Sequence, residues 1–156
     1  MIRDMIPEDS DALVHIAEGT GVFKPMEIDT LREVLADYFA TERIRGHRCF
    51  ALLSGERIVG FAYHAPEPMT EGTWYLYWIA VRAGEQARGM GARLLKAVEE
   101  DVRRLGGRVL FIETSGLPHY EKTRRFYLKH GYEQEAVLRE YYAAGDDLVV
   151  FRKALS

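Results

Sequence analysis

The sequence predicts a single α/β domain, residues 1–156, with a mixed and mostly antiparallel sheet of about six to seven strands, a parallel central pair and about four flanking helices. Three observations support this prediction. The chain has 156 residues, 47% of them hydrophobic, which suits one compact domain with its own core. The spacing of apolar residues changes along the chain between the period of a helix and that of a strand. No internal repeat, low-complexity tract or linker divides the sequence.

Two helices open the predicted fold. Residues that favour a helix start stand at 8–10, and apolar residues follow at helical spacing over 12–17 until Gly19 ends the pattern. A second apolar stripe covers 28–39, with charged residues on its opposite face. Both segments are therefore expected to lie on the sheet with one face buried.

The pattern then changes to that of strands. Segments 49–53 and 58–63 flank a turn around Gly55 and predict an antiparallel hairpin. Segment 74–81 is apolar at every position, which predicts a central strand covered on both faces.

The second half of the chain predicts a crossover between parallel strands. An amphipathic helix over 94–105 is followed by a strand over 109–112. A strand, a helix and a strand with this connection length predict a right-handed crossover, with 74–81 beside 109–112. The remaining elements are a helix over 122–130 and strands over 132–138 and 148–152.

Composition excludes several classes of function. The chain has 24 acidic and 21 basic residues and a net charge of -3, which argues against a general nucleic-acid binder. Cys49 is the only cysteine, so an internal disulfide and a cysteine-built zinc site are excluded, and no metal site is predicted. Charges interrupt residues 1–8, and the longest apolar stretch, 74–81, is far shorter than the roughly 20 residues of a membrane-spanning helix. We expect a cytoplasmic protein without a signal peptide and without a membrane or nucleic-acid partner.

Two glycines mark a loop that enters a helix. Segment 86–95 reads QARGMGARLL and places Gly89 and Gly91 between the central strand and the following helix. Glycine lets backbone amides approach a ligand, and a helix N terminus favours an anion, so the loop predicts a phosphate site. Leu94 stands where a Rossmann fingerprint needs its third glycine, and Met90 stands where a P-loop needs lysine. A loop that only requires unusual backbone angles would carry the same two glycines.

The loop resembles the acyl-CoA pyrophosphate loop of the GNAT superfamily of N-acetyltransferases. The superfamily pattern Q/R-x-x-G-x-G/A is met by Gln86 and the two glycines, after a strand end at 79–81 and before an amphipathic helix. A second hallmark, a Phe-Tyr pair followed by a glycine-aromatic pair, is met by FYLKHGY at 126–132. The resemblance covers about 74–132, and the order of the other elements also fits.

The resemblance implies an acetyl-CoA site at the central strand and the loop. In the superfamily the pantetheine arm lies along the splayed strand, and the loop amides hold the pyrophosphate with Gln86 and Arg88 in support. The implied cofactor-binding residues are Ile79, Ala80, Val81, Gln86, Ala87, Arg88, Gly89, Met90, Gly91 and Ala92.

The resemblance also implies a general acid, Tyr127, that protonates the departing CoA thiolate. A phenol with a pKa of about 10 is reasonable opposite a thiol near 8.5, although a buried aromatic would fit the same position. An alkylamine is protonated at neutral pH and needs a base, yet 74–78 lacks the glutamate that some members carry there. Glu113 is the candidate base, with a salt-bridged or solvent-facing strand end as the competing interpretation. His119 and Glu121 acting through water are lesser candidates.

The expected acceptor is a primary amine of a small molecule or peptide. Superfamily members recognise it with the first two helices, their loop and the late hairpin, where Tyr141, Tyr142, Asp146 and Asp147 suit a cationic amine. Direct attack in a ternary complex is expected, because Cys49 lies on an early strand away from the site. A non-catalytic acyl-CoA sensor and a nucleotide-dependent enzyme stay open as alternatives. A homodimer is also open, since relatives are commonly dimers.

Overall fold

One seven-stranded sheet forms the centre of the structure, a computed structural model that describes Met1 to Ser156 apart from Ala87. The strand order is β1-β2-β3-β4-β5-β7-β6. The strands are β1 (Ile2–Asp4), β2 (Arg48–Ser54), β3 (Arg57–Pro66), β4 (Thr73–Val81), β5 (Val109–Ser115), β6 (Glu133–Ala143) and β7 (Asp146–Ala154). The helices are α1 (Ser10–Gly19), α2 (Pro25–Asp37), α3 (Met90–Arg104) and α4 (Glu121–Lys129).

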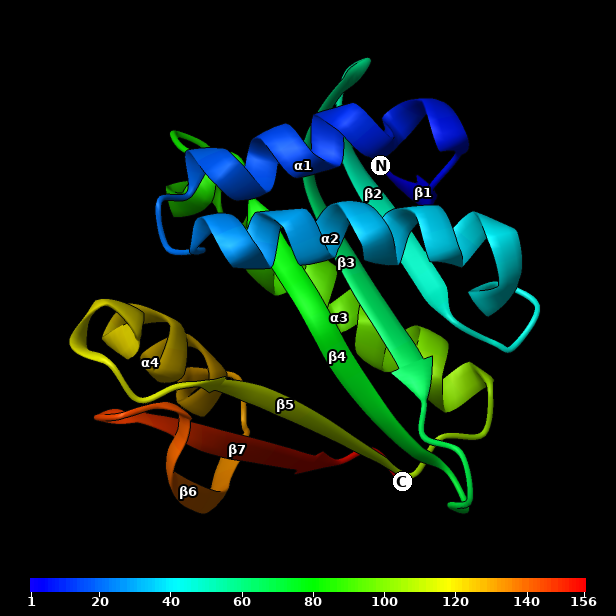
Figure 1. Cartoon of the computed structure of the whole chain (residues 1–156). Coiled ribbons are helices and arrows are strands. Elements are labelled where there is room, and N and C mark those ends of the chain that lie inside the picture. Colours follow the sequence, from blue (N-terminus) through cyan, green and yellow to red (C-terminus); the bar gives the residue numbers. More distant parts are fainter.

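Helices cover both faces of the sheet. α1 and α2 lie side by side over β2, β3 and β4, while α3 lies on the opposite face (Figure 1). The apolar stripe of α2 buries Leu31 against Phe61 in one core, and that of α3 buries Leu94 and Val98 with Leu110 in a second. Each fully buried side chain of this kind contributes about 1.5–3 kcal/mol. Among the helices of the described residues, none has the length and apolar composition needed to cross a membrane.

The parallel pair is short, and the sheet forks after it. Only 73–76 of β4 pair with 109–112 of β5. A β-bulge opposite Tyr63 leaves Tyr77 as the extra residue of β4, and in the described chain 77–81 have no partner in β5. The sheet therefore divides into two half-sheets, β1–β4 and β5–β7–β6, because β4 and β5 diverge after their short paired stretch (Figure 1). We call this divergence the fork.

The predicted fold class is confirmed, with a mixed seven-stranded sheet, a parallel pair and four α-helices. The prediction for 74–81 is wrong in one respect, because Tyr77 is 50% exposed rather than covered. The bulge lies at Tyr77, and the pairing of β4 with β5 ends at the residue before it. The Tyr77 side chain therefore has fewer neighbouring strand residues to cover it. β1 is an additional strand, three residues long, which pairs Arg3 with Ala51 at the edge of the sheet.

Candidate functional site

The glycine loop ends β4 and begins α3. Gly89 is the N-cap of α3 with φ at 72°, in the left-handed region that favours glycine. The first N–H···O bond of the helix runs from Arg93 N to Gly89 O (3.1 Å). The amides of Met90, Gly91 and Ala92 precede that bond and are free at the positive end of the helix. This arrangement can hold an anion by its backbone alone.

The side chains of the loop differ in their roles. Gln86 Nε2 donates a hydrogen bond to Val81 O (3.2 Å), which holds the loop against the end of β4. Arg88 is exposed, with Nη1 3.4 Å from Glu85 Oε2. A surface pair of this kind contributes little and leaves the guanidinium able to turn toward a phosphate. Ala87, the other predicted contact here, lies outside the described residues.

The free edge of β4 leads from the fork to this loop. Ile79 packs against the core on the α3 side, and Ala80 is buried in the core under α1 and α2. Their backbone groups on the β5 side, like those of Val81, have no strand partner in the described chain. An extended ligand with amide groups can therefore pair with β4 as an added strand. The predicted cofactor residues that the structure describes thus form a track along β4 and into the loop.

Tyr127 lies on α4 beside this track. It is 3% exposed, and its ring lies 5.6 Å from Phe151 and 5.9 Å from Tyr132. Burial raises the pKa of Tyr127, so the phenol keeps its proton at neutral pH. The next ring, Phe126, closes on the glycine loop, since a Cβ on Gly91 would lie 3.4 Å from Phe126 Cζ. α4 therefore places Tyr127 near the α3 side of the fork.

Glu113 lies on β5 immediately after the last residue that pairs with β4. Its side chain alternates with Ile112, which is buried on the α3 side, and so projects from the opposite face. Loss of hydration, and then the nearby Glu67 carboxylate, raise the pKa of Glu113. A raised pKa moves a carboxylate toward the range useful for a base near neutral pH.

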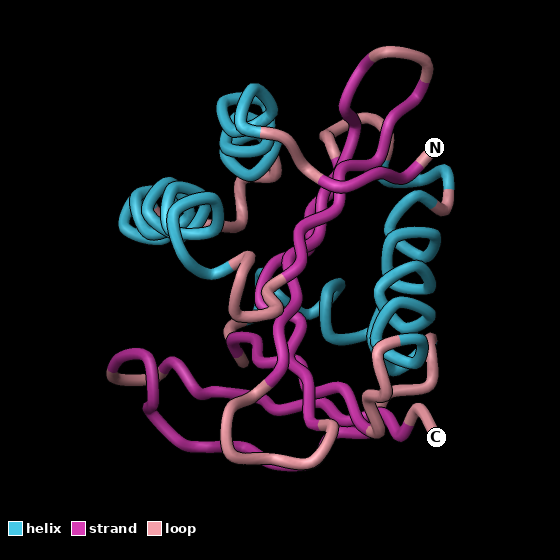
Figure 2. The backbone as a smooth tube through the Cα atoms, turned by 90° about the vertical axis from the view of Figure 1, so that its right-hand side faces the viewer, coloured by secondary structure: helices cyan, strands magenta, loops and turns pink.

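The hairpin of β6 and β7 bends toward the side of the sheet that carries α1 and α2 (Figure 2). Lys24 Nζ, before α2, lies 3.6 Å from Asp146 Oδ2, and Ser115 Oγ at the end of β5 donates to Asp146 Oδ1. Tyr120 OH donates to Val22 O (3.0 Å). The helix loop and the late hairpin, both expected to recognise the acceptor, are therefore brought together around the open end of β5.

The four predicted acceptor residues have different surroundings. Asp146 is 4% exposed and already paired, and Asp147 Oδ1 accepts a hydrogen bond from Glu140 N (2.9 Å). Tyr141 and Tyr142 are exposed, with their rings 5.2 Å apart and edge to face. The tyrosines form a rim that a ligand can reach, whereas the aspartates hold the hairpin. A contact between these residues and an amine stays a prediction.

The sequence analysis missed Tyr75 and Tyr77 as site residues. Their rings stack with centroids 5.6 Å apart, and Tyr75 lies 5.7 Å from Phe111 on the adjacent strand. Both project from the sheet face that carries Glu113. Strand alternation puts 75 and 77 on one face, and this spacing is the signal in the sequence that could have identified the pair.

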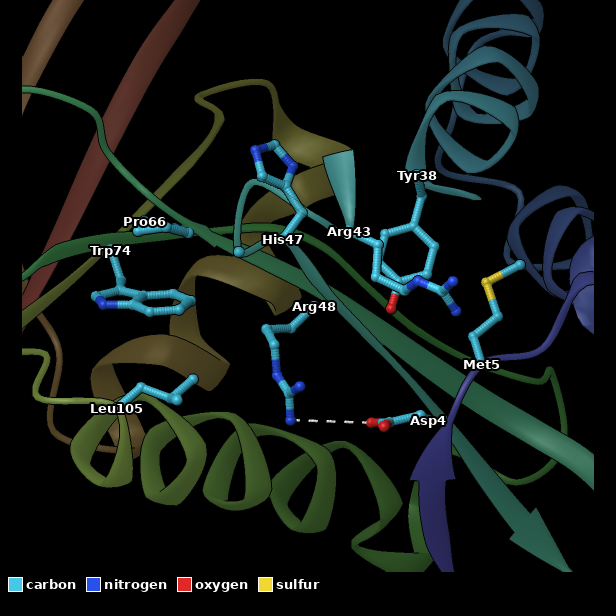
Figure 3. Close-up of a pocket in the computed structure, with 10 residues that line it drawn as sticks. Asp4, Met5, Tyr38, Arg43, His47, Arg48, Pro66, Trp74 and Leu105 are labelled. Carbon is cyan, nitrogen blue, oxygen red and sulfur yellow. Dashed lines mark ion pairs between the residues drawn. The ribbon is translucent and has the colours of Figure 1, made fainter. Parts of the chain in front are cut away.

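A cavity of about 360 Å³ lies far from this track, at the opposite ends of β4 and α3 (Figure 3). Its lining includes Trp74 at the start of β4 and Leu105 after α3. Arg48 lies 3.9 Å from Asp4 there and donates through Nε to Asp101 Oδ2 (2.9 Å). No described residue of the predicted site lines this cavity. Across the part of the chain that the structure describes, no group of three His, Cys, Asp or Glu side chains is placed to hold a metal ion.

Comparison with known proteins gives concordant matches. The model of the acetyltransferase (GNAT) family matches residues 15–132. A protein from Desulfovibrio desulfuricans assigned to the same family is 39% identical, with a TM-score of 0.95 over 100% of this chain and 99% of that chain. No match is found among curated proteins.

Two further solved structures share the fold at lower identity. An aminoglycoside 6'-N-acetyltransferase complexed with coenzyme A is 21% identical, with a TM-score of 0.83 over 100% of this chain and 97% of that chain. The ribosomal-protein-S18-alanine N-acetyltransferase from Escherichia coli is 21% identical, with a TM-score of 0.80 over 100% of this chain and 94% of that chain.

Proposed function

This chain belongs to the acetyltransferase (GNAT) family, and from this premise we propose that it transfers the acetyl group of acetyl-CoA to a primary amine of a small molecule or peptide. The fork is the observation that carries the proposal. The free edge of β4 beyond Leu76 leads directly to the open N terminus of α3. A long ligand with amides at one end and a pyrophosphate at the other suits that track, and one structural neighbour was solved with coenzyme A.

The proposed cosubstrate contacts follow the track. The backbone of Ile79, Ala80 and Val81 pairs with the pantetheine amides, and the loop from 86 to 92, Ala87 included, surrounds the pyrophosphate. Arg88 supplies a mobile positive charge. Acetyl-CoA supplies an activated thioester carbonyl at the fork.

Two side chains of the chain handle protons in the proposed reaction. Glu113 accepts the proton of the bound ammonium group, directly or through a water, because a charged amine has no lone pair for attack. The neutral amine forms a bond to the carbonyl carbon while the carbon–sulfur bond breaks, and the nitrogen releases its second proton to solvent. Tyr127 donates its phenol hydrogen bond and then its proton to the departing thiolate, and solvent restores the proton. Tyr141 and Tyr142 contact the acceptor at the rim, with Asp146 and Asp147 fixing the hairpin that carries them.

The change Tyr127→Phe tests this function. We expect kcat to fall roughly 10²-fold or more, since a general acid contributes about 10²–10⁴-fold. The Kd for acetyl-CoA, measured by isothermal titration, should stay within about twofold, because the removed hydroxyl acts on the leaving group. A matched control is Tyr132→Phe, which removes a neighbouring buried hydroxyl that donates to Glu99 (2.7 Å). This change should lower the free energy of unfolding and have little effect on kcat.

Three results would contradict the proposal at different points. An unchanged kcat in Tyr127→Phe removes the acid role. Binding of acetyl-CoA without transfer across a broad amine panel identifies an acyl-CoA sensor on the same fold. Failure of folded protein to bind acetyl-CoA at all removes the cosubstrate.

A further inference from the structure

We propose that Glu67, Tyr75 and Tyr77 form a subsite for a second cationic group of the acceptor, so that the preferred substrates are diamines and longer polyamines. This inference rests on the proposed transfer to an amine and specifies the class of that amine. None of these three residues belongs to the cosubstrate track or to the proton-handling pair.

The floor of the subsite is an aromatic stretch of open sheet. Tyr75 and Tyr77 stack at 5.6 Å with their planes 22° apart, and the row continues to Tyr63, whose ring is 6.5 Å from that of Tyr77. β4 is the middle strand of seven, yet Tyr77 is half-exposed, since it is the bulged residue of β4 and the pairing with β5 ends before it. An accessible aromatic face on a central strand is a binding surface rather than a core.

Glu67 stands at the edge of this floor. Its N–H donates to Thr73 O (2.8 Å), which extends the β3–β4 ladder by one residue pair. Ala65 is opposite Tyr75 in that ladder, so Glu67, two residues on, projects from the same face. Burial is the main cause that raises the pKa values of Tyr75 and Tyr77, and the charges of Glu113 and Glu67 add to it at both residues, as expected for carboxylates near the rings.

The negative charge here has no counter-ion among the residues that the structure describes. Among the described residues, the carboxylates of Glu67 and Glu113 make no ion pair, although each lies near the other and near the two tyrosine rings. A cation placed over the rings and beside Glu67 gains both a cation–π contact and an opposite charge. The floor and its edge therefore favour a cationic group over a neutral or anionic one.

The reaction itself requires that this cation be a second group. The attacking nitrogen is neutral at the moment of transfer, so a charge that stays beside Glu67 belongs to another nitrogen of the same molecule. Glu67 is opposite Thr73 of β4, and Thr73 is opposite Val109 of β5, so Glu113 lies two strands away and four residues further along the sheet. Two nitrogens joined by a methylene chain that crosses the tyrosine rings suit this arrangement.

Paired amines test the subsite directly. 1,4-Diaminobutane and n-butylamine differ by one terminal amine, and binding of each to protein saturated with CoA is measured by isothermal titration, which needs no turnover. We expect the diamine to bind about tenfold more tightly, and to show a similar advantage in kcat/KM with acetyl-CoA. Glu67→Gln and Tyr77→Leu should each reduce the advantage to within about threefold, whereas Tyr77→Phe, which keeps the aromatic face, should retain it.

The matched control is Glu71→Gln, which removes the same charge from an exposed position of the same turn and should leave the advantage unchanged. Equal binding of the two amines to the wild-type protein overturns the subsite. So does a loss of the diamine's binding advantage in Glu71→Gln that equals the loss in Glu67→Gln. Failure of the proposed function looks different. Acetyl-CoA then fails to bind or no amine is acetylated, while the binding comparison between the two amines, repeated on the protein without CoA, still decides the subsite.

Discussion

At the scale of single residues, the two proposed proton-handling groups lie on opposite faces of the sheet. Tyr127 packs in the core on the α3 side, whereas Glu113 projects from the face that carries α2. The fork is the one place where β4 and β5 separate enough for a reaction to involve both faces. In the proposed reaction one proton leaves the amine on one face and a different proton, from Tyr127, reaches the thiolate from the other, so base and acid do not neutralise each other directly.

The acid limb of the pH profile follows from the pKa of Glu113. As a base this carboxylate must be ionised, so activity falls as the pH falls through its raised pKa. Glu67→Gln removes a neighbouring negative charge, which favours ionised Glu113 and lowers its pKa. We expect the acid limb of kcat/KM for n-butylamine to move to lower pH in Glu67→Gln and to stay in place in Glu71→Gln. A limb that stays in place in Glu67→Gln or moves upward would contradict the role of Glu113.

At the scale of elements, the start of α3 depends on the backbone conformation of its N-cap residue. Gly89 is the N-cap with φ at 72°, and a Cβ there would meet open space. Only the backbone conformation, and not crowding, opposes a larger residue at this position. The loop geometry and the start of the helix are therefore fixed together.

Gly89→Ala tests that coupling. We expect the free energy of unfolding to fall by about 1 kcal/mol, because the left-handed conformation costs an L-residue roughly 1–2 kcal/mol. Binding of acetyl-CoA should weaken as well, because the amides after residue 89 shift. Gly19→Ala at the end of α1 is the control, since its backbone is ordinary and its surroundings are open, and it should cause no loss. Equal effects of the two changes in urea unfolding would contradict the explanation.

Most elements could be predicted because their apolar residues repeat over several turns or strand positions. β1 could not, since three residues are too few to show a period. The glycine loop and the candidate general acid, Tyr127, could be proposed from short sequence patterns with fixed spacing. The bulge at Tyr77 and the ion pair of Lys24 with Asp146 depend on contacts between distant segments, which no local pattern records.

At the scale of the whole molecule, a buried carboxylate ties α3 to the first half-sheet. Asp101 of α3 accepts hydrogen bonds from Arg48 of β2 (2.9 and 3.0 Å), from His64 of β3 (2.8 Å) and from Arg104 (2.7 Å). Burial alone would raise the pKa of Asp101, but these hydrogen bonds outweigh it and hold the pKa well below its usual value. Ionised Asp101 therefore stabilises the native state.

Asp101→Asn should lower the free energy of unfolding by about 1–3 kcal/mol at pH 7, because it removes the charge that the partly exposed Arg48 and Arg104 face and weakens the hydrogen bond to buried His64. In the unfolded wild-type chain Asp101 takes up a proton near pH 4, so its contribution is complete above that pH and is lost as the pH falls below it. The difference in the free energy of unfolding between wild type and variant, measured by urea titration, should therefore decrease below about pH 4. Asp29→Asn, at an exposed position of α2, should show neither effect. A difference that stays constant with pH would contradict the assignment.

The fork has a further consequence for the protein without its ligand. Natural proteins shield unpaired strand edges, because such edges recruit other extended chains and seed aggregation. This sheet carries two such edges in its interior, on β4 and β5, at the fork. If acetyl-CoA covers these edges as proposed, its concentration determines how long newly synthesised molecules remain prone to aggregation. A shortage of acetyl-CoA would then reduce the amount of folded protein as well as the turnover rate of each molecule.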